Sequence, residues 1–266
     1  MATTDFTSRE PLTVRCKRLV PKNAKAEKVS DRQEKIPGWN QEKLSSATVV
    51  MQGAGGIGSV VSRALVRQGV GALHLCDPDI VQASNLSRQE FSLEDLLKPK
   101  AHRLAMSLAS MGVQGTSITG YPLYFSEFLQ VYRGSTPDAV ISGVDNNSAR
   151  LEAATWCRQI KKPLICAGVA LDAIGAYVFV QEPGRGCLGC YLGDHLLKGG
   201  AVCPRSPAVV DVLLVLSGFS SFAISSLLMG RERSWNLTRF FMSSATAESR
   251  TVAIARDCPL CKGRGA

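Results

Sequence analysis

A glycine-rich turn joins an apolar strand to an amphipathic helix early in the most regular part of the chain. The turn reads Gly53-Ala-Gly55-Gly56-Ile-Gly58, with ATVVMQ (47–52) before it and SVVSRALVRQ (59–68) after it. A second apolar segment, GALHLC, follows at 71–76, and this order predicts a parallel βαβ unit. Glycines let phosphate approach the backbone, and the free N–H groups at the helix start then face the anion. The four glycines therefore predict a nucleotide-binding turn.

The alternation of strand and helix continues to residue 168 and then stops. We expect further helices at 101–111 and 149–160 and further strands at 138–143 and 163–168. This pattern predicts an α/β fold with a Rossmann-like, mostly parallel sheet and helices on both faces. A smaller C-terminal part should extend it, with a strand at 173–181, a long apolar helix, short strands near 251–255 and a terminal cysteine pair.

Length and composition suit a single domain preceded by an arm. The chain has 266 residues, of which 45% are apolar and 20% charged, enough for one large core or two small ones. We expect one domain at 36–266, with a nucleotide-binding half at about 47–168 and a second half at about 169–266. Residues 1–35 are rich in Lys and Arg and poor in large apolar residues, so we expect a flexible basic arm there.

Charge and cysteine content point to a reducing compartment. The net charge of +9 would suit an acidic partner, although charge alone says little about chemistry. Nine cysteines form an odd set, and no signal peptide is recognisable. We therefore expect a cytoplasmic protein whose cysteines are thiols or metal ligands.

The stretch Val212–Gly230 has 19 residues without a charge, enough on paper to cross a bilayer. Five serines reduce its hydrophobicity, and they recur at spacings that place small polar side chains on one helix face. We expect no membrane span and assign the stretch to a buried core helix or a subunit interface.

A polar and cationic run lies directly beyond the second strand. Asp77 ends that strand, where a carboxylate can accept a hydrogen bond from a ribose hydroxyl. The glycine turn and this acid fit NAD(P) as well as ATP, but the cations that follow suit a triphosphate, since Arg88 can bind phosphate oxygens as a fork. The candidate nucleotide ligands beyond the glycines are Asp77, Asp79, Asn85, Arg88, Gln89, Lys100 and Asp145.

Asp145 follows the strand at 138–143, at the sheet edge where open α/β folds bind ligands. Its carboxylate suits a Mg²⁺ ion. It could instead cap the helix that follows, although Asn146 or Asn147 could also do this.

Two C-x-x-C pairs stand far apart in the second half. They are Cys187/Cys190 and Cys258/Cys261, with 67 residues between them. Each pair can place two thiolates on one tetrahedral ion, so four sulfurs predict structural Zn²⁺. A redox role for either pair is the alternative, and the matched knuckles favour zinc.

These features together resemble the ThiF/MoeB/HesA family, the bacterial relatives of ubiquitin-activating enzymes. The segments VVMQGAGGIGS, DPDIVQASNLSRQ, KPK and SGVDNN occur in the family's order and near its spacings, and the resemblance runs from about Arg32 to Cys261. It implies that Asp77 binds ribose, that Asn85, Arg88 and Lys100 hold phosphates, and that Asp145 positions Mg²⁺. It also implies that Arg32, in the arm, reaches the ATP of a partner subunit.

The resemblance implies an ATP-dependent adenylating enzyme. Its substrate would be the C-terminal carboxylate of a ubiquitin-like or sulfur-carrier protein ending in a Gly-Gly-type sequence, bound by the half at about 169–266. Cys203 matches a family cysteine that can take up the activated acyl group. A homodimer is expected, and nucleic acid is not an expected partner, because the tRNA-modifying relatives tend to lack the Cys₄ site.

Three alternatives remain open at this point. One is an adenylating enzyme that modifies a ribosomal peptide rather than a carrier protein. Another is an NAD(P)-dependent oxidoreductase with structural zinc, and a third is a binding module without catalysis.

Overall fold

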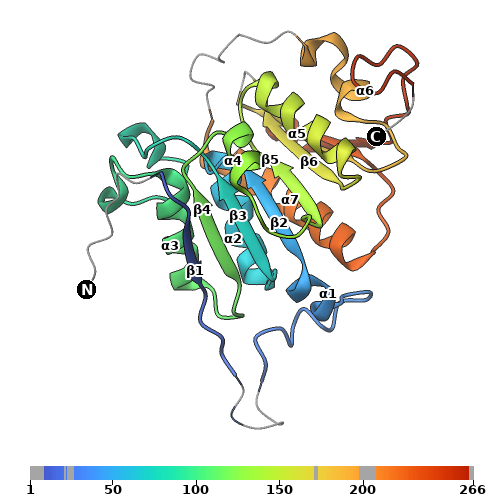
Figure 1. The fold of residues 1–266 in the computed structure, drawn as a ribbon. Helices are drawn as coiled ribbons and strands as arrows, with labels where there is room; N and C mark the ends of the chain where they lie inside the picture. Colours follow the sequence, from blue (N-terminus) through green and yellow to red (C-terminus); the bar gives the residue numbers. More distant parts are fainter. Residues whose placement is uncertain (1–8, 21, 23–26, 171–172, 198–207, 264–266) are drawn as a thin grey trace.

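A computed structural model describes residues 9–20, 22, 27–170, 173–197 and 208–263. Its centre is one nine-stranded sheet with the order β1-β4-β3-β2-β5-β6-β7-β8-β9 (Figure 1). The strands are β1 (Leu12–Arg15), β2 (Thr48–Gln52), β3 (Ala72–Cys76), β4 (Ser117–Tyr121), β5 (Ala139–Ser142), β6 (Leu164–Val169), β7 (Gly175–Gln181), β8 (Leu237–Phe241) and β9 (Thr246–Arg250). The α-helices are α1 (Gln41–Ser46), α2 (Gly56–Gln68), α3 (Lys100–Met111), α4 (Phe125–Val131), α5 (Asn147–Gln159), α6 (Leu188–Leu192) and α7 (Val210–Met229).

The five central strands, β4-β3-β2-β5-β6, run parallel to one another. The outer strands are antiparallel, with β1 beside β4 on one side and β7, β8 and β9 continuing the other side. Because β2, β3 and β5 are parallel, their carboxyl ends meet at one edge of the sheet. The glycine turn, Asp77 and Asp145 all follow strands that end at this edge.

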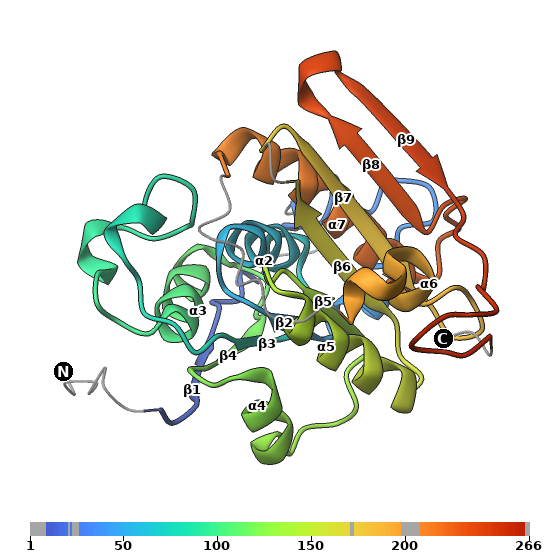
Figure 2. The same ribbon diagram turned by 90° about the horizontal axis from the view of Figure 1, so that it is seen from above.

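Helices cover both faces of the sheet (Figures 1 and 2). One apolar core lies between the sheet and α2, α3 and α7, and a second lies between the sheet and α4, α5 and α6. The predicted α/β class, with a Rossmann-like parallel centre and helices on both faces, is confirmed.

The apolar helix α7 is a core element of this fold. In the described part of the chain it is the helix long and apolar enough to cross a membrane, judged by length and composition. Its buried face, which includes Ser217, Ser220 and Ser221, packs against α2, β6 and β7. The burial of these small serines agrees with the core helix that the sequence predicts.

Part of the expected N-terminal arm belongs to the sheet. Leu12–Arg15 pairs with β4 as an edge strand, and the Cys16 that follows is buried against α3. The alternation of Leu12, Val14 and Cys16 provides the apolar face that this pairing needs, although basic residues surround it in sequence.

The strands expected near 251–255 are wrong. The structure has none at these residues and instead forms the hairpin of β8 and β9 just before them. At Val252 the backbone N–H donates to Asn236 Oδ1 (2.7 Å) rather than to a neighbouring strand. A buried asparagine side chain therefore takes the place of a ladder partner.

Candidate active site and metal centre

The glycine turn is held in a shape that other residues could not adopt. Gly53 has φ +93°, and its N–H donates to Cys76 O (2.8 Å), which joins the turn to β3. A Cβ on Gly58 would lie 1.8 Å from Gly53 O, so helix α2 can begin this close to the turn only without a side chain there. The first N–H groups of α2 consequently face the carboxyl edge of the sheet.

Asp77 braces this turn. Its Oδ2 accepts from the N–H of Ala54 (2.6 Å), and its Oδ1 accepts from the N–H of Asp79 (2.9 Å). The carboxyl group is buried, and burial raises the pKa of Asp77, while the nearby Lys100 ammonium opposes that rise. Asp77 thus fixes the glycine turn relative to β3, in addition to the ribose contact expected of it.

Lys100 is a buried cation at the start of α3. Its ammonium lies 2.8 Å from Asp79 Oδ2, and its side chain is 9% exposed whereas that of Asp79 is 64% exposed. The backbone N–H of Lys100 also donates to Asp79 O (2.9 Å). A buried ammonium needs an anionic or polar partner. Here the exposed carboxylate of Asp79 is that partner, and an incoming phosphate could bind the ammonium beside it.

The segment between β3 and α3 carries the other candidate phosphate ligands. Asn85 is buried, and its Oδ1 accepts from the N–H of Gln82 (2.9 Å), which leaves the amide nitrogen of Asn85 as the donor for a ligand. Arg88 donates to Ser84 O, and its own carbonyl oxygen lies near Gly56. The polar run that the sequence places directly beyond the second strand therefore lies beside the glycine turn.

Gln89 lies over the turn itself. Its Nε2 would lie 3.8 Å from a Cβ on Gly55, and within the described residues its Oε1 is buried without a hydrogen-bond donor. A buried acceptor of this kind normally has a partner. The hydroxyl or amino groups of a nucleotide would provide such donors, so the residues around the turn fit this kind of ligand.

Two ion pairs hold this segment in position, and neither was predicted from the sequence. Arg63 of α2 binds Glu90 through both carboxylate oxygens (3.0 and 2.9 Å), and Arg103 of α3 binds the buried Asp95. The partners in the first pair are 27 residues apart, so local spacing could not have indicated it. The cationic segment is thereby tied to both helices that flank the site.

Asp145 is exposed at the carboxyl edge, after β5. The following helix is capped by Asn146, whose Oδ1 accepts from the N–H of Ala149 (2.8 Å). Asn146, and not Asp145, therefore caps the helix, and binding of Mg²⁺ is the role that is left for Asp145. The carboxylate is left at the surface, and its oxygens suit a Mg²⁺ ion bound together with phosphates.

Two expected site residues are not brought to this place. Arg32 has an 85% exposed side chain and lies 3.9 Å from Glu27. The next residue, Gln33, donates to Gln68 O, at the end of α2 remote from the glycine turn. Since α2 has 13 residues, that end is about 18 Å away. Cys203 lies outside the described residues.

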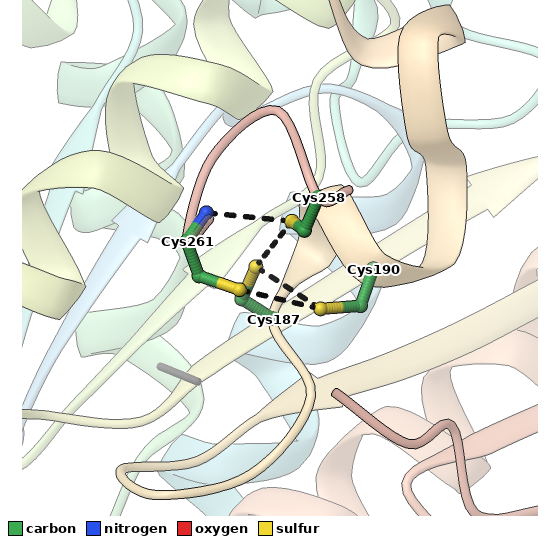
Figure 3. A group of neighbouring side chains, drawn as sticks. All are labelled: Cys187, Cys190, Cys258 and Cys261. Atoms are coloured by element: carbon green, nitrogen blue, oxygen red, sulfur yellow. Dashed lines mark hydrogen bonds between the residues drawn. The ribbon is translucent and has the colours of Figure 1, made fainter. Parts of the chain in front are cut away.

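The two C-x-x-C pairs come together as predicted (Figure 3). All four Sγ atoms lie within 4.8 Å of one another, and three of the separations are 3.7 Å (Cys187–Cys190), 3.4 Å (Cys187–Cys258) and 3.6 Å (Cys190–Cys261). A tetrahedral ion with Zn–S bonds of about 2.3 Å sets its ligands about 3.8 Å apart. The cluster therefore fits zinc.

Backbone groups support thiolates in this cluster. The N–H of Ala255 points at Cys190 Sγ (3.4 Å), and that of Cys261 points at Cys258 Sγ (3.3 Å). Burial raises the pKa of Cys187 and of Cys190, so the free thiols are neutral, and a bound cation would favour the thiolates instead. A metal here would join the chain end to α6.

Two surface hollows, of about 360 and 540 Å³, lie elsewhere. Both include Leu227 of α7, and the first is also lined by Lys43, Asp138 and Lys162. Neither contains a residue of the candidate nucleotide site. The candidate nucleotide site consists of loops at the carboxyl edge of the sheet, away from both hollows.

Comparison with known proteins gives three findings. A model of the family described as "ThiF family" matches residues 27–262. The sulfur carrier protein ThiS adenylyltransferase of Escherichia coli (strain K12) is 29% identical over 237 residues, which cover 85% of this chain and 90% of that protein. A crystal structure of E. coli MccB superposes with a TM-score of 0.70 at 22% identity, covering 85% of this chain and 68% of the other, and shows the likeness of fold.

A second group of relatives has longer chains. Ubiquitin-like modifier-activating enzyme 5 of Arabidopsis thaliana is 28% identical over 204 residues, which cover 66% of this chain but 47% of that protein. The chain thus spans about half the length of this relative. The family model covers most of the chain, including the glycine turn, the cationic segment and the cysteine cluster. The protein therefore belongs to the ThiF family.

Proposed function

We propose that the protein is an ATP-dependent adenylating enzyme whose substrate is the C-terminal carboxylate of a ubiquitin-like or sulfur-carrier protein. A carboxylate oxygen attacks the α-phosphate of ATP, the bond to the bridging oxygen of the pyrophosphate breaks, and acyl-adenylate and pyrophosphate form. The names of the relatives support this choice, since the E. coli and Bacillus subtilis proteins are ThiS adenylyltransferases.

The reaction needs positioning and charge stabilisation rather than a base, because a carboxylate is already ionised at pH 7. Lys100 and Arg88 would bind phosphate oxygens and stabilise the negative charge that develops on pyrophosphate. Asn85 would donate from its free amide nitrogen. Mg²⁺ held by Asp145 would neutralise further phosphate charge.

One observation carries the proposal: a buried ammonium and a buried acceptor without a donor lie beside a glycine turn at a helix start. Lys100 and Gln89 provide these two groups. A nucleoside triphosphate has the anionic oxygens that suit the first and the hydroxyl and amino donors that suit the second. The zinc cluster in this proposal is structural.

We include a homodimer in the proposal. In one protomer, Arg32 lies at the wrong end of α2 to reach the site. An arginine that acts on ATP from this position must act on a neighbouring copy. The outer side of α7 also exposes Val210, Leu214 and Phe222, which are four and eight residues apart and so share one helix face, and this suits burial against another subunit.

Transfer of the acyl group to Cys203 is proposed as an optional second step. The thiolate would attack the acyl carbon, and AMP would leave. Cys203→Ser should then remove a thioester that an added thiol cleaves by taking up the acyl group and releasing the cysteine, while adenylation itself continues.

The family assignment favours adenylation over the NAD(P)-dependent oxidoreductase. An adenylating enzyme that modifies a peptide would use the same chemistry and is the second candidate. The likeness to MccB concerns the fold and does not choose between the two substrates.

ATP–pyrophosphate exchange tests the proposal. We expect exchange that depends on Mg²⁺ and on a carrier protein with a free C-terminus, and that falls at least 100-fold in Arg88→Ala and in Asp145→Ala. Lys162→Ala is the matched control, since its partner Asp138 precedes β5, at the opposite edge of the sheet. Retained exchange in both site variants would show that the assigned site is wrong.

A further inference from the structure

Helix α5 begins beside the candidate magnesium ligand and packs against the segment that carries the first cysteine pair (Figure 2). Asp145 is exposed two residues before the first residue of α5, Asn147. A 3₁₀ turn, Gly193–Leu196, follows α6 directly and contacts α5, and Leu196 belongs to the same buried core as Ala153 of α5. We call residues 187–196 the zinc unit. One helix thus starts at the nucleotide site and rests on the zinc unit.

A buried glutamine attaches α5 to the start of the zinc unit. Gln181, the last residue of β7, is 1% exposed. Its Nε2 donates to Ala154 O (3.0 Å), and its Oε1 accepts from the N–H of Leu188 (3.0 Å), the residue after Cys187. The second half of α5 and the first cysteine pair are therefore held by the same side chain.

Asn147 attaches the start of α5 to the other end of the zinc unit. Its Nδ2 donates to His195 O (2.7 Å), and its Oδ1 accepts from Arg150 Nη1 (3.1 Å). The helix is capped by Asn146, so the amide of Asn147 is not needed as a cap. The hydrogen bond from Asn147 to His195 O therefore fixes the chain two residues beyond Asp145 against the zinc unit.

The first turn of α5 is also joined to the strand that precedes the glycine turn. Gln52 ends β2, and its Nε2 donates to Ala149 O (2.9 Å), while its Oε1 accepts from Ser142 Oγ (2.7 Å) at the end of β5. Gln52 and Ser142 are both buried. The sheet thus holds this turn of the helix from one side, and the zinc unit holds it from the other through Asn147.

The position of the zinc unit depends on the four cysteines. Helix α6 has five residues, and the described residues 251–263, which contain the second cysteine pair, form neither helix nor strand. Helices this short are not stable by themselves. A zinc ion bound by all four sulfurs would join these two segments, and its loss would loosen the turn that provides His195 O.

We propose that Asn147 is a positioning residue that makes the affinity for Mg·ATP depend on the zinc unit. Its hydrogen bond to His195 O orients the first turn of α5, and with it the Asp145 carboxylate that would bind Mg²⁺. This inference rests on the proposed function and adds to it, because the zinc cluster then supports nucleotide binding as well as the fold. Asn147 itself contacts neither nucleotide nor metal in this role.

The first measurement is the Kd for Mg·ATP, by titration calorimetry on zinc-loaded protein. We expect Asn147→Ala to raise this Kd about three- to tenfold, because one hydrogen bond that orients the magnesium ligand is lost. Gln114→Ala is the matched control. Its amide nitrogen likewise donates to a backbone oxygen, Arg67 O (2.8 Å), but near the end of α2 remote from the glycine turn, so its Kd should stay at the wild-type value.

The second measurement separates this role from a purely local one. Coupling between two sites is reciprocal, so Mg·ATP must stabilise the zinc unit by the same factor by which the zinc unit favours Mg·ATP. Amide hydrogen exchange of residues 187–197, followed by mass spectrometry, reports local opening of this segment. Saturating Mg·ATP should slow this exchange about three- to tenfold in the wild type and in Gln114→Ala, and should leave it unchanged in Asn147→Ala.

Either measurement can overturn the inference. A wild-type Kd in Asn147→Ala, or equal slowing of exchange in that variant and the wild type, would show that Asn147 does not connect the two sites, and would leave the adenylation proposal intact. If Asn147→Ala does not fold or loses its zinc, Asn147→Ser is measured in its place. If the wild type binds no Mg·ATP, the proposed function fails, and this inference fails with it.

Discussion

Replacing Gly58 by alanine should damage both the fold and the site. The added Cβ would lie 1.8 Å from Gly53 O, while real Cβ contacts stay above 3.0 Å, so the backbone must move by about 1.2 Å. The added Cβ and Gly53 O are both attached directly to the backbone inside the core, so rotation of a side chain cannot relieve the clash. Overpacking typically costs about 1–3 kcal/mol, and a clash between backbone atoms belongs at the upper end of that range.

A loss of about 3 kcal/mol would lower the melting temperature by about 6–12 °C in a chain of this size. The displaced N–H groups of α2 should also weaken ATP binding about tenfold or more, because a hydrogen bond to a charged phosphate contributes about 1.5–3 kcal/mol. Thermal unfolding and titration calorimetry with Mg·ATP measure the two quantities.

Gly218→Ala is the matched control for this prediction. Gly218 also lies within a helix, but among the described residues of one protomer nothing comes within 4 Å of an added Cβ, so the substitution should stabilise the single protomer by about 0.5–1 kcal/mol. Opposite signs for the two glycines are expected. A Gly58→Ala protein with wild-type stability and affinity would refute the geometry of the turn.

Three further predictions concern the site, the metal and pH. Lys100→Met should raise the KM for ATP at least tenfold, measured by pyrophosphate exchange, because a charge-assisted phosphate contact of about 1.5–3 kcal/mol is lost; an unchanged KM would remove Lys100 from the site. The purified protein should contain one zinc per chain by mass spectrometry, and Cys258→Ser should lose it together with several kcal/mol of stability; a metal-free protein of equal stability would count against the cluster. Burial lowers the pKa of His74 below its usual 6.5, so the folded state disfavours the protonated ring, and stability should fall as the pH drops from 7.5 to 5.5 in urea unfolding. His74→Phe should reduce that fall, leaving the effect of His102, whose pKa burial also lowers, and an identical pH dependence in the variant would contradict this account.

The periodic part of the chain was predictable, and the parts stabilised by long-range contacts were not. Apolar strands alternating with amphipathic helices from residue 47 to 168 have one stable arrangement, a parallel sheet covered on both faces. The strand β4 was missed, because Ser117–Tyr121 is short and includes Gly120. The edge strand β1 was hidden by the basic residues around it. The segment 251–255 has strand-forming residues, yet the side chain of Asn236 binds its backbone.

In the candidate site, the sequence predicts residues whose roles follow from local spacing, and it does not predict those that act through contacts between distant segments. The glycine turn, the cationic segment and the two cysteine pairs each carry their chemistry within a few neighbouring residues. The brace from Asp77 to Ala54 and the pair Arg63–Glu90 join distant segments, so only the folded chain shows them. Arg32 was expected in the site from the sequence but lies away from it in one protomer, so its expected role requires a second copy of the chain.

The central claim is that a nucleoside triphosphate lies across the glycine turn. A crystal structure with Mg²⁺ and a non-hydrolysable ATP analogue tests it most directly. The account predicts phosphates against the first N–H groups of α2, contacts from Lys100 and Arg88, and a donor from the nucleoside on Gln89 Oε1. A structure with the turn free of nucleotide, or with the Lys100 ammonium still bound to Asp79 and remote from every phosphate, would contradict it.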